Sequence, residues 1–347
     1  MLSLTMLPAR QGDCLWISYG EERSPHHLVI DGGPERAKVL RSAIVSRIAA
    51  APDRKLHIDL LVATHIDNDH IGGILDVMRD FPDGLSIGDI WFNGYRHLPK
   101  DLLGADQGER LTEALTAQRL PWNEAFGGGA VMIGDSGALP QRIRQDGLKL
   151  TLLGPGRDQL ARLAKVWKKA VLDSERSERD NSGDLLGRHD PWPPQITDLA
   201  NLPFKSDDGE ANGSSIALLL AYKDKQILLA ADAHAPALAR AIGRLDGGGA
   251  LTLQAYKLSH HGSRKSTSTE LLQRVTCDQY LISSNGSYFG HPDPEAIARV
   301  LLHGGNNPKL IFNSRERYAL RWKNVPGAPA FRAQFPDDEA AGMRIEF

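Results

Sequence analysis

The feature that most constrains this chain is the run Thr-His-Ile-Asp-Asn-Asp-His-Ile-Gly-Gly at residues 64–73. It places four candidate metal ligands, His65, Asp67, Asp69 and His70, within six residues. Imidazole nitrogens and carboxylate oxygens hold zinc, manganese or iron while leaving positions open for water and substrate. Neighbouring carboxylates repel each other, so the cluster is costly to assemble without a cation. The run therefore favours a metal site over its alternative, a polar loop that only joins two elements.

The flanking residues predict a strand that ends at this cluster and a helix that begins there. Residues 56–63 alternate and then run apolar, as a strand entering a buried sheet does. Apolar residues from 71 to 81 recur at helical spacing, and Pro82 closes the segment. The ligands are therefore expected where the carboxyl end of a strand turns into a helix.

Length and composition limit the class of protein. With 347 residues, 41% hydrophobic and 24% charged, the chain is long enough to bury a full core. A net charge of −2 provides no global attraction for nucleic acid or anionic membrane. Two cysteines exclude a disulfide framework, and no apolar run approaches the ~20 residues that span a bilayer. We expect a cytoplasmic protein with no membrane contact.

The chain is predicted to form one domain over residues 1–347 with two additions. Residues 173–210 are rich in Ser, Asp, Arg, Gly and Pro, and they predict a mobile insertion. This insertion is interpreted as a solvated surface loop, with a substrate-gating lid as the alternative. Residues 304–347 are predicted to be a C-terminal extension.

The second half of the chain repeats the pattern of strands that end at polar residues. Residues 215–230 predict a β-hairpin that delivers Asp232 at the end of a buried strand. Such a carboxylate is either a helix cap or a ligand. Two histidine stations follow, His260-His261 within Ser-His-His-Gly-Ser and His291 within Gly-His-Pro. Together with Asp232, these histidines could complete the metal site predicted at residues 64–73.

In combination these motifs resemble the metallo-β-lactamase superfamily, and within it the hydrolase domain of ComEC-type DNA-uptake proteins. The resemblance includes Gln-Gly-Asp at 11–13 and Ile-Asp-Gly-Gly at 30–33, and it covers roughly residues 1–80 and 210–303. It implies an α/β fold, the four-layer αββα sandwich, with a dinuclear metal site at the sheet edges.

The resemblance also implies a ligand set: His65 and Asp67 on one metal, Asp69 and His70 on the other, Asp232 bridging the two, and His260 completing the coordination of the second metal. Asp67 replaces a histidine that is common in the wider superfamily. Its hard oxygen tilts the choice of metal from zinc toward manganese or a zinc/manganese mixture.

The sequence departs from the superfamily pattern at two further positions. The histidine expected before the hairpin is absent, and Asn212 takes about that place. Ala231 stands where a glycine is usual, which is tolerable unless that position needs a positive φ.

The expected chemistry is attack by a water that two divalent ions activate. Asp69 would orient that water or accept its proton, and His261 and His291 would stabilise the charged transition state. A purely structural role for His291 is the alternative. The expected substrate-binding residues, which supply amide, hydroxyl and cationic groups suited to a phosphate, are Asn212, Ser263, Arg264, Lys265 and Ser266.

Two helices have alternative interpretations. Thr267 and Glu270 fit a capping box, which would either direct free N–H groups at a phosphate or only cap a surface helix. Residues 160–171 predict a basic amphipathic helix, which would either follow a nucleic-acid backbone or present a solvated face.

The sequence supports three functions. The first is a metal-dependent phosphodiesterase, a nuclease acting on DNA. The second is a hydrolase of a small phosphodiester or phosphocholine-type ester. The third is a metal-stabilised binding or sensor subunit with weak catalysis. A lactamase or lactonase fits less well because two of the usual histidines are missing. A protein partner cannot be read from the sequence.

Overall fold

The structure, a computed structural model, describes residues 1–99, 110–177, 192–245 and 249–347. In this part of the chain most strands form two sheets, of six and eight strands. The six-stranded sheet, in spatial order, contains β18 (Met343–Glu346), β1 (Leu2–Met6), β2 (Leu15–Glu21), β3 (Ser24–Ile30), β5 (Leu60–Val62) and β7 (Ile90–Trp91). The eight-stranded sheet contains β17 (Arg332–Gln334), β16 (Lys309–Phe312), β15 (Gln279–Ile282), β13 (Ala255–Lys257), β11 (Lys225–Leu229), β10 (Ala217–Tyr222), β9 (Lys149–Gly154) and β8 (Gln141–Ile143).

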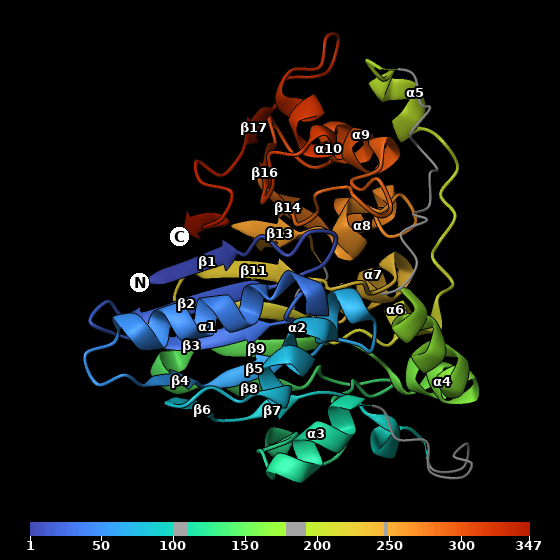
Figure 1. Cartoon of the computed structure of the whole chain (residues 1–347). Helices are drawn as coiled ribbons and strands as arrows, with labels where there is room; N and C mark the ends of the chain where they lie inside the picture. Colours follow the sequence, from blue (N-terminus) through green and yellow to red (C-terminus); the bar gives the residue numbers. More distant parts are fainter. Residues whose placement is uncertain (100–109, 178–191, 246–248) are drawn as a thin grey trace.

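Helices lie on the outer faces of the two sheets (Figure 1). Their bounds are α1 (Val39–Ala50), α2 (Asn68–Arg79), α3 (Arg110–Gln118), α4 (Arg157–Ser177), α5 (Ile196–Ala200), α6 (Glu210–Gly213), α7 (Ala235–Ile242), α8 (Thr269–Gln273), α9 (Pro294–His303) and α10 (Arg317–Leu320). No helix of the described residues is both long and apolar enough to cross a membrane.

The alternation of side chains along the strands explains the layers. In β10, Leu218 and Leu220 point into the core between the sheets, whereas Ala217 and Leu219 point toward α7, α8 and α9. A third core joins the outer face of the six-stranded sheet to α1 and α2. Three cores separate four layers, helix, sheet, sheet and helix, so the metallo-β-lactamase αββα sandwich predicted from the sequence is confirmed.

Parallel pairing brings the polar loops to the sheet edges. Strands β3, β5 and β7 run parallel in one sheet, and β11, β13, β15 and β16 run parallel in the other. Carboxyl ends of parallel strands lie at the same edge, which is where α/β proteins place their ligands. The loops after β3, β5, β11 and β13 carry Asp31, residues 64–67, Asp232 and residues 259–262.

Two local predictions differ from the structure in detail. The predicted hairpin is present as β10 and β11, with Tyr222 opposite Lys225. Residues 56–63, however, form two short strands instead of one. The first, β4 (Leu56–Ile58), pairs with β6 (Leu85–Ile87), and only β5 joins the main sheet. The break falls at Asp59, a buried residue whose carboxylate accepts a hydrogen bond from the His27 N–H at 2.8 Å.

The described residues of the two predicted additions pack against the other elements. Of the insertion predicted at 173–210, residues 178–191 lie outside the described part, and residues 192–210 include α5, which buries Ile196 and Ala200. Residues 304–347 supply β16 and β17 to one sheet and β18 to the other. The C-terminal segment is therefore integral to both sheets.

Candidate metal centre

The first ligands come from the turn between β5 and α2. Asp67 holds the N-cap position of α2, yet its side chain caps no N–H group. Its Oδ2 instead lies 3.5 Å from Nε2 of His65. The other ring nitrogen of His65 lies 3.0 Å from the Thr64 hydroxyl, which leaves Nε2 directed at the site. The turn thus presents both side chains to one space, as the sequence predicts.

Four imidazole rings converge on the carboxylate of Asp232. Its Oδ2 lies 3.4 Å from Nε2 of His70 and 3.9 Å from Nε2 of His65. The same oxygen lies 3.7 Å from Nε2 of His260 and 3.8 Å from Nε2 of His261. Only 3% of the Asp232 side chain is exposed. This arrangement suits the bridging position that the resemblance implies for Asp232.

The two adjacent histidines occupy different parts of the centre. His260 and His261 both have positive φ, 49° and 55°, a conformation that side chains with a Cβ rarely adopt. The strained turn sends His261 inward, where its Nε2 lies 3.4 Å from Oδ2 of Asp69. His260 faces the cavity, with 19% of its side chain exposed. The sequence-based assignment names His260 as a metal ligand and His261 as a group that stabilises the transition state. In the structure, however, it is His261 whose ring nitrogen lies within 4.8 Å of other candidate ligand atoms, those of Asp69 and His70.

Unpartnered buried atoms show that the residues fit metal ions. The Nε2 atoms of His65, His70 and His261 and the Oδ1 of Asp232 are buried without a hydrogen-bond partner among the described residues. Each such atom costs about 1–3 kcal/mol if it stays unsatisfied. Ligand atoms of His65, His70 and Asp232 lie within 4.8 Å of one another, as do those of Asp69, His70 and His261. These two groups overlap at His70, and each offers three ligand atoms that could hold a metal ion.

Carboxylates behind the rings fix their orientation. Nδ1 of His70 lies 2.8 Å from Oδ2 of Asp31, and Nδ1 of His261 lies 2.9 Å from the Ser283 carbonyl and 3.4 Å from Oδ1 of Asp13. Such outer partners set the tautomer and raise the basicity of a ligating histidine. In the sequence, Asp13 and Asp31 stand out only as parts of motifs, and their role in orienting histidine rings is not apparent. The signal that could have suggested this role is their position next to strands, Asp13 shortly before one and Asp31 directly after another.

Asp13 is also half of a buried ion pair. Its Oδ2 lies 2.7 Å from Nζ of Lys257, and neither side chain is more than 1% exposed. Burial disfavours ionisation of Asp13, but Lys257 and then His261 hold its pKa well below the usual range. The pair ties the loop before β2 to the end of β13, and so it joins the two sheets directly behind the centre.

The ring charges depend on the surrounding carboxylates. Burial alone would lower the pKa of His70, but Asp232, Asp31 and Asp69 raise that pKa well above its ordinary value. For His261, burial is likewise outweighed by Asp232 and Asp13, and its pKa rises to about 9. A metal ion entering this centre must therefore displace protons from imidazole rings.

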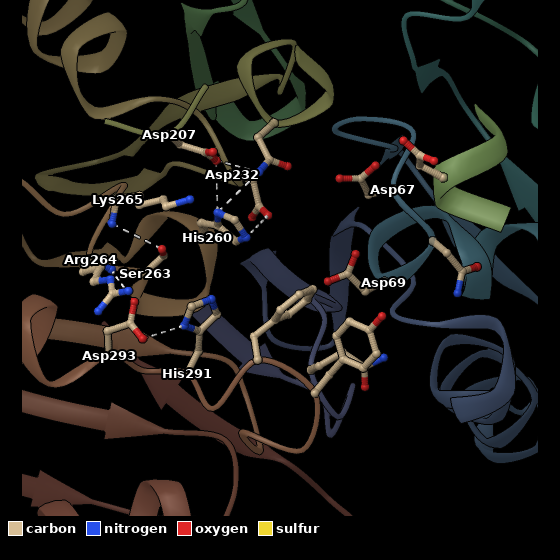
Figure 2. Close-up of a pocket in the computed structure, with 16 residues that line it drawn as sticks. Asp67, Asp69, Asp207, Asp232, His260, Ser263, Arg264, Lys265, His291 and Asp293 are labelled. Carbon is tan, nitrogen blue, oxygen red and sulfur yellow. Dashed lines mark hydrogen bonds and ion pairs between the residues drawn. The ribbon is translucent and has the colours of Figure 1, made fainter. Parts of the chain in front are cut away.

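The place of the missing histidine is taken by an amide and a carboxylate. The Asn212 side chain donates a hydrogen bond of 2.7 Å to Oδ2 of Asp207. The same oxygen lies 3.3 Å from Nδ1 of His260 (Figure 2). Among the described residues, the groups of candidate metal ligands within 4.8 Å of one another consist of histidines and aspartates and do not include Asn212. Asp207 was missed because it falls inside the segment predicted as a mobile insertion, where no apolar pattern marks a fixed position.

A cavity of about 360 Å³ opens onto the centre. Its walls include the predicted residues Asn212, Ser263, Arg264, Lys265, His260 and His291, together with Asp67, Asp69, Asp207 and Asp232 (Figure 2). Ser266 does not line this cavity, and its side chain is fully buried.

The cationic side chains differ in their availability. The guanidinium of Arg264 lies 2.9 Å from Glu295, so much of its charge is neutralised within the protein. Lys265 is exposed at the cavity wall, and no carboxylate partner for it is present in the described ranges. His291 lies 3.3 Å from Asp293, and its ring centroid is 5.4 Å from that of His260. Lys265 and His291 are therefore the groups placed to meet negative charge in the cavity.

One predicted cap is wrong by one residue. Ser268, not Thr267, is the N-cap of α8, and its hydroxyl accepts a hydrogen bond from the Leu271 N–H at 3.1 Å. The helix α8 has five residues, Thr269–Gln273. The predicted amphipathic helix, in contrast, is present as α4, which buries Leu160, Leu163 and Trp167.

Comparison with known proteins finds one family model and several solved structures. Residues 9–143 match the family described as Metallo-beta-lactamase superfamily. No curated protein matches the sequence. Two solved structures are similar over nearly the whole chain. The metallo-beta-lactamase fold protein YhfI from Bacillus subtilis is 8% identical, with a TM-score of 0.37 and coverage of 100% of both chains. CmlA, a diiron beta-hydroxylase from Streptomyces venezuelae, is 12% identical, with a TM-score of 0.41 and coverage of 99% of this chain and 54% of that one.

The family match contains the first four candidate ligands, and the αββα layers place Asp232 and His261 against them. Residues 9–143 are therefore similar to the metallo-β-lactamase superfamily, and the described part of the chain has the αββα layers of that fold.

Proposed function

We propose that this protein is a metal-dependent phosphodiesterase of the ComEC-like type, a nuclease that acts on DNA with zinc or manganese. The observation that carries the proposal is the convergence of three unpartnered Nε2 atoms, from His65, His70 and His261, on Asp232 at the floor of an open cavity. Divalent ions held there would lower the pKa of a water and polarise a phosphoryl oxygen.

The protein side chains supply the remaining functions. Asp69 reaches the cavity with 20% of its side chain exposed, so it is placed to accept a proton from the attacking water. Lys265 and His291 lie across the cavity from Asp69 (Figure 2), so they would meet negative charge that develops on the phosphate. Asp207 lies beside Nδ1 of His260, so it is placed to direct Nε2 of His260 toward Asp232, where His260 would serve as a metal ligand.

An aromatic pair favours a nucleotide over a simple phosphate ester. Tyr288 and Phe289 line the cavity with ring centroids 4.3 Å apart, and Phe289 stacks on His291 at 5.7 Å. Bases stack on such rings regardless of sequence, with about 1–3 kcal/mol per base. A base beside the scissile phosphate would therefore find a platform here.

The cavity volume favours one alternative within the enzymes. A space of about 360 Å³ is of the size that holds a small molecule, so hydrolysis of a small phosphodiester or phosphocholine-type ester is the second candidate.

Metal analysis combined with a substrate panel tests the proposal. Protein purified without chelator should carry close to two transition-metal ions per chain, and manganese should support cleavage of linear DNA and of bis-p-nitrophenyl phosphate. Turnover of the small diester without DNA cleavage would select the second candidate. Bound metal without turnover of DNA, RNA, small diesters or lactones would make the protein a binding or sensor subunit.

A further inference from the structure

A second, larger depression adjoins the metal cavity. It measures about 910 Å³ and is lined by residues of α4, α7, the end of β9 and the segment 206–208. Asp207 lines both spaces, so the depression and the metal cavity share a wall. We call this depression the arginine groove, because it is lined by Arg157, Arg162, Arg240, Arg244 and Arg274.

Rigid elements hold these arginines in place. Arg240 lies on the exposed face of α7, whose opposite face packs Leu238 and Ile242 into the core. Arg244 follows α7 and donates hydrogen bonds to the carbonyls of Gly134 and Gly137, at 2.8 and 3.0 Å from its two terminal nitrogens. In Figure 1, α7, α6 and α4 lie together on one side of the molecule.

The charge of the groove is only partly balanced within the protein. Arg162, Arg240 and Arg274 are exposed, and among the described residues none of the three has a carboxylate partner. Four carboxylates line the same groove: Asp135, Asp158, Asp207 and Asp208. Asp207 is already engaged by Asn212 and His260 on the metal side. Apart from Arg157, four arginines, Arg162, Arg240, Arg244 and Arg274, therefore line the groove together with three carboxylates that are not engaged on the metal side.

The backbone path links the groove to the metal centre. Asp232 is followed after one residue by His234, the N-cap residue of α7, and His234 lines the groove. If one phosphate of a polyanion lies beside Asp232, the next phosphates along the chain could pass Asp207 and reach the guanidinium groups of the arginine groove. A small diester would not extend that far.

We propose that the arginine groove binds the phosphate backbone of a nucleic-acid strand that extends from the metal cavity, so that the substrate is a polynucleotide and not a small diester. This inference rests on the proposed phosphodiesterase function. Guanidinium groups bind phosphate through paired N–H donors and release counterions from the strand, so groove binding depends on salt concentration.

The test neutralises the three exposed arginines together, as Arg162→Gln, Arg240→Gln and Arg274→Gln. The control removes three exposed arginines outside the groove, as Arg23→Gln, Arg54→Gln and Arg119→Gln. Binding of a fluorescent 30-nucleotide single strand is measured by anisotropy on chelator-treated protein, where no cleavage occurs. Cleavage of the same strand and of bis-p-nitrophenyl phosphate is then measured on manganese-loaded protein.

The groove variant should bind the strand at least about tenfold more weakly, and the slope of log affinity against log salt should fall by about 2. The ratio of strand cleavage to small-diester cleavage, each as kcat/KM, should fall by a similar factor. The control variant should keep the wild-type affinity for the strand and the wild-type ratio of strand cleavage to small-diester cleavage within about twofold.

Three results would overturn the inference. Equal strand binding by the groove variant and the wild type would exclude the groove as a backbone site. An equal loss in the control variant would show a non-specific charge effect. Displacement of the strand by polyglutamate as effectively as by unlabelled DNA would assign the groove to acidic protein segments. A wild-type protein that binds the strand through the groove but cleaves no diester would instead contradict the proposed phosphodiesterase function.

Discussion

At the scale of single residues, Asp232 combines two properties that rarely occur together. Its side chain is almost fully buried, and one of its oxygens has no hydrogen-bond partner among the described residues. Burial disfavours the charged form, but His70 first and then His260 and His261 hold the pKa of Asp232 well below its usual range. Asp232 therefore stays ionised although it is buried, and its negative charge must be balanced by protonated histidines or by metal ions.

Asp232→Asn should therefore abolish hydrolysis while the fold remains. The amide keeps the shape of the carboxylate but removes the charge, so we expect loss of at least one bound metal and a fall in kcat/KM of more than about 100-fold. Metal content, circular dichroism and diester turnover measure the effect. Asp83→Asn, at an exposed residue that does not line the cavity, is the control. Retained activity in Asp232→Asn would exclude the bridging role.

Ala231 carries the positive φ that the sequence comparison raises as a question. Its φ is 47°, and its carbonyl accepts the His260 N–H at 2.9 Å, so this turn sets the spacing between the two ligand loops. A side chain with a Cβ in the left-handed region costs about 1–2 kcal/mol, and glycine avoids that cost at a smaller loss of backbone entropy.

Ala231→Gly is expected to raise the free energy of unfolding by up to about 1 kcal/mol. Urea denaturation of metal-free protein measures it. Ala230→Gly is the matched control, because Ala230 is fully buried, has no positive φ and should lose stability. Destabilisation of both variants by the same amount would show that the turn at residue 231 is not strained.

At the scale of elements, the site depends on how strand ends are tied to one another. The carboxylate of Asp31 accepts hydrogen bonds from the N–H and the hydroxyl of Thr64, both at 2.8 Å, and so joins the ends of β3 and β5. The Asp13–Lys257 pair joins the loop before β2 to β13 of the other sheet. These links fix the ligands that follow β5 in one sheet relative to the ligands that follow β13 in the other sheet.

The Asp13–Lys257 link can be tested by a double-mutant cycle. Lys257→Met leaves a buried carboxylate without its partner, so we expect a loss of about 3–5 kcal/mol in the free energy of unfolding. Adding Asp13→Asn removes that charge and should restore part of the loss. Additive effects of the two changes, measured by chemical denaturation, would mean that the residues do not interact.

Much of the element pattern could be predicted from the sequence, because it depends on local spacing. The helical spacing after residue 70 and the apolar hairpin at 215–230 both correspond to elements of the structure, α2 and β10–β11. The division of residues 56–63 into two strands could not be predicted, since it depends on which distant strands, β6 and β3, lie beside each half. The cap at Ser268 differs from the prediction by one residue because the chain offers several adjacent hydroxyl groups there.

At the scale of the whole molecule, proton and metal binding should be coupled. In metal-free protein the pKa of His261 is about 9, above the ordinary value of 6.5. Its contribution to stability is therefore fully present below pH 6.5 and is lost as the pH rises through about 9. Metal binding has the opposite dependence, because deprotonated rings are the ligands and rising pH removes the competing protons.

Between pH 6.5 and 9, chelator-treated protein should thus lose thermal stability with rising pH, while the stability gained from added manganese or zinc should increase. Thermal unfolding with and without metal across this range measures both trends. Calorimetry in buffers of different ionisation enthalpy should show protons released on metal binding. Parallel pH profiles for the two forms would contradict the coupling of imidazole deprotonation to metal binding.

The sequence by itself determined the ligand types at residues 65–70, because short-range spacing is a local property of a chain, and the resemblance of its motifs to the metallo-β-lactamase superfamily implied the sandwich. Only the tertiary structure decided which of two adjacent histidines faces Asp69, since a turn with two positive φ values sends them to different sides. It alone placed Asp207 beside His260, and it alone gathered the arginines of α4 and α7 beside the cavity. These contacts join residues far apart in the chain, and their distances follow from the packing of two sheets against each other.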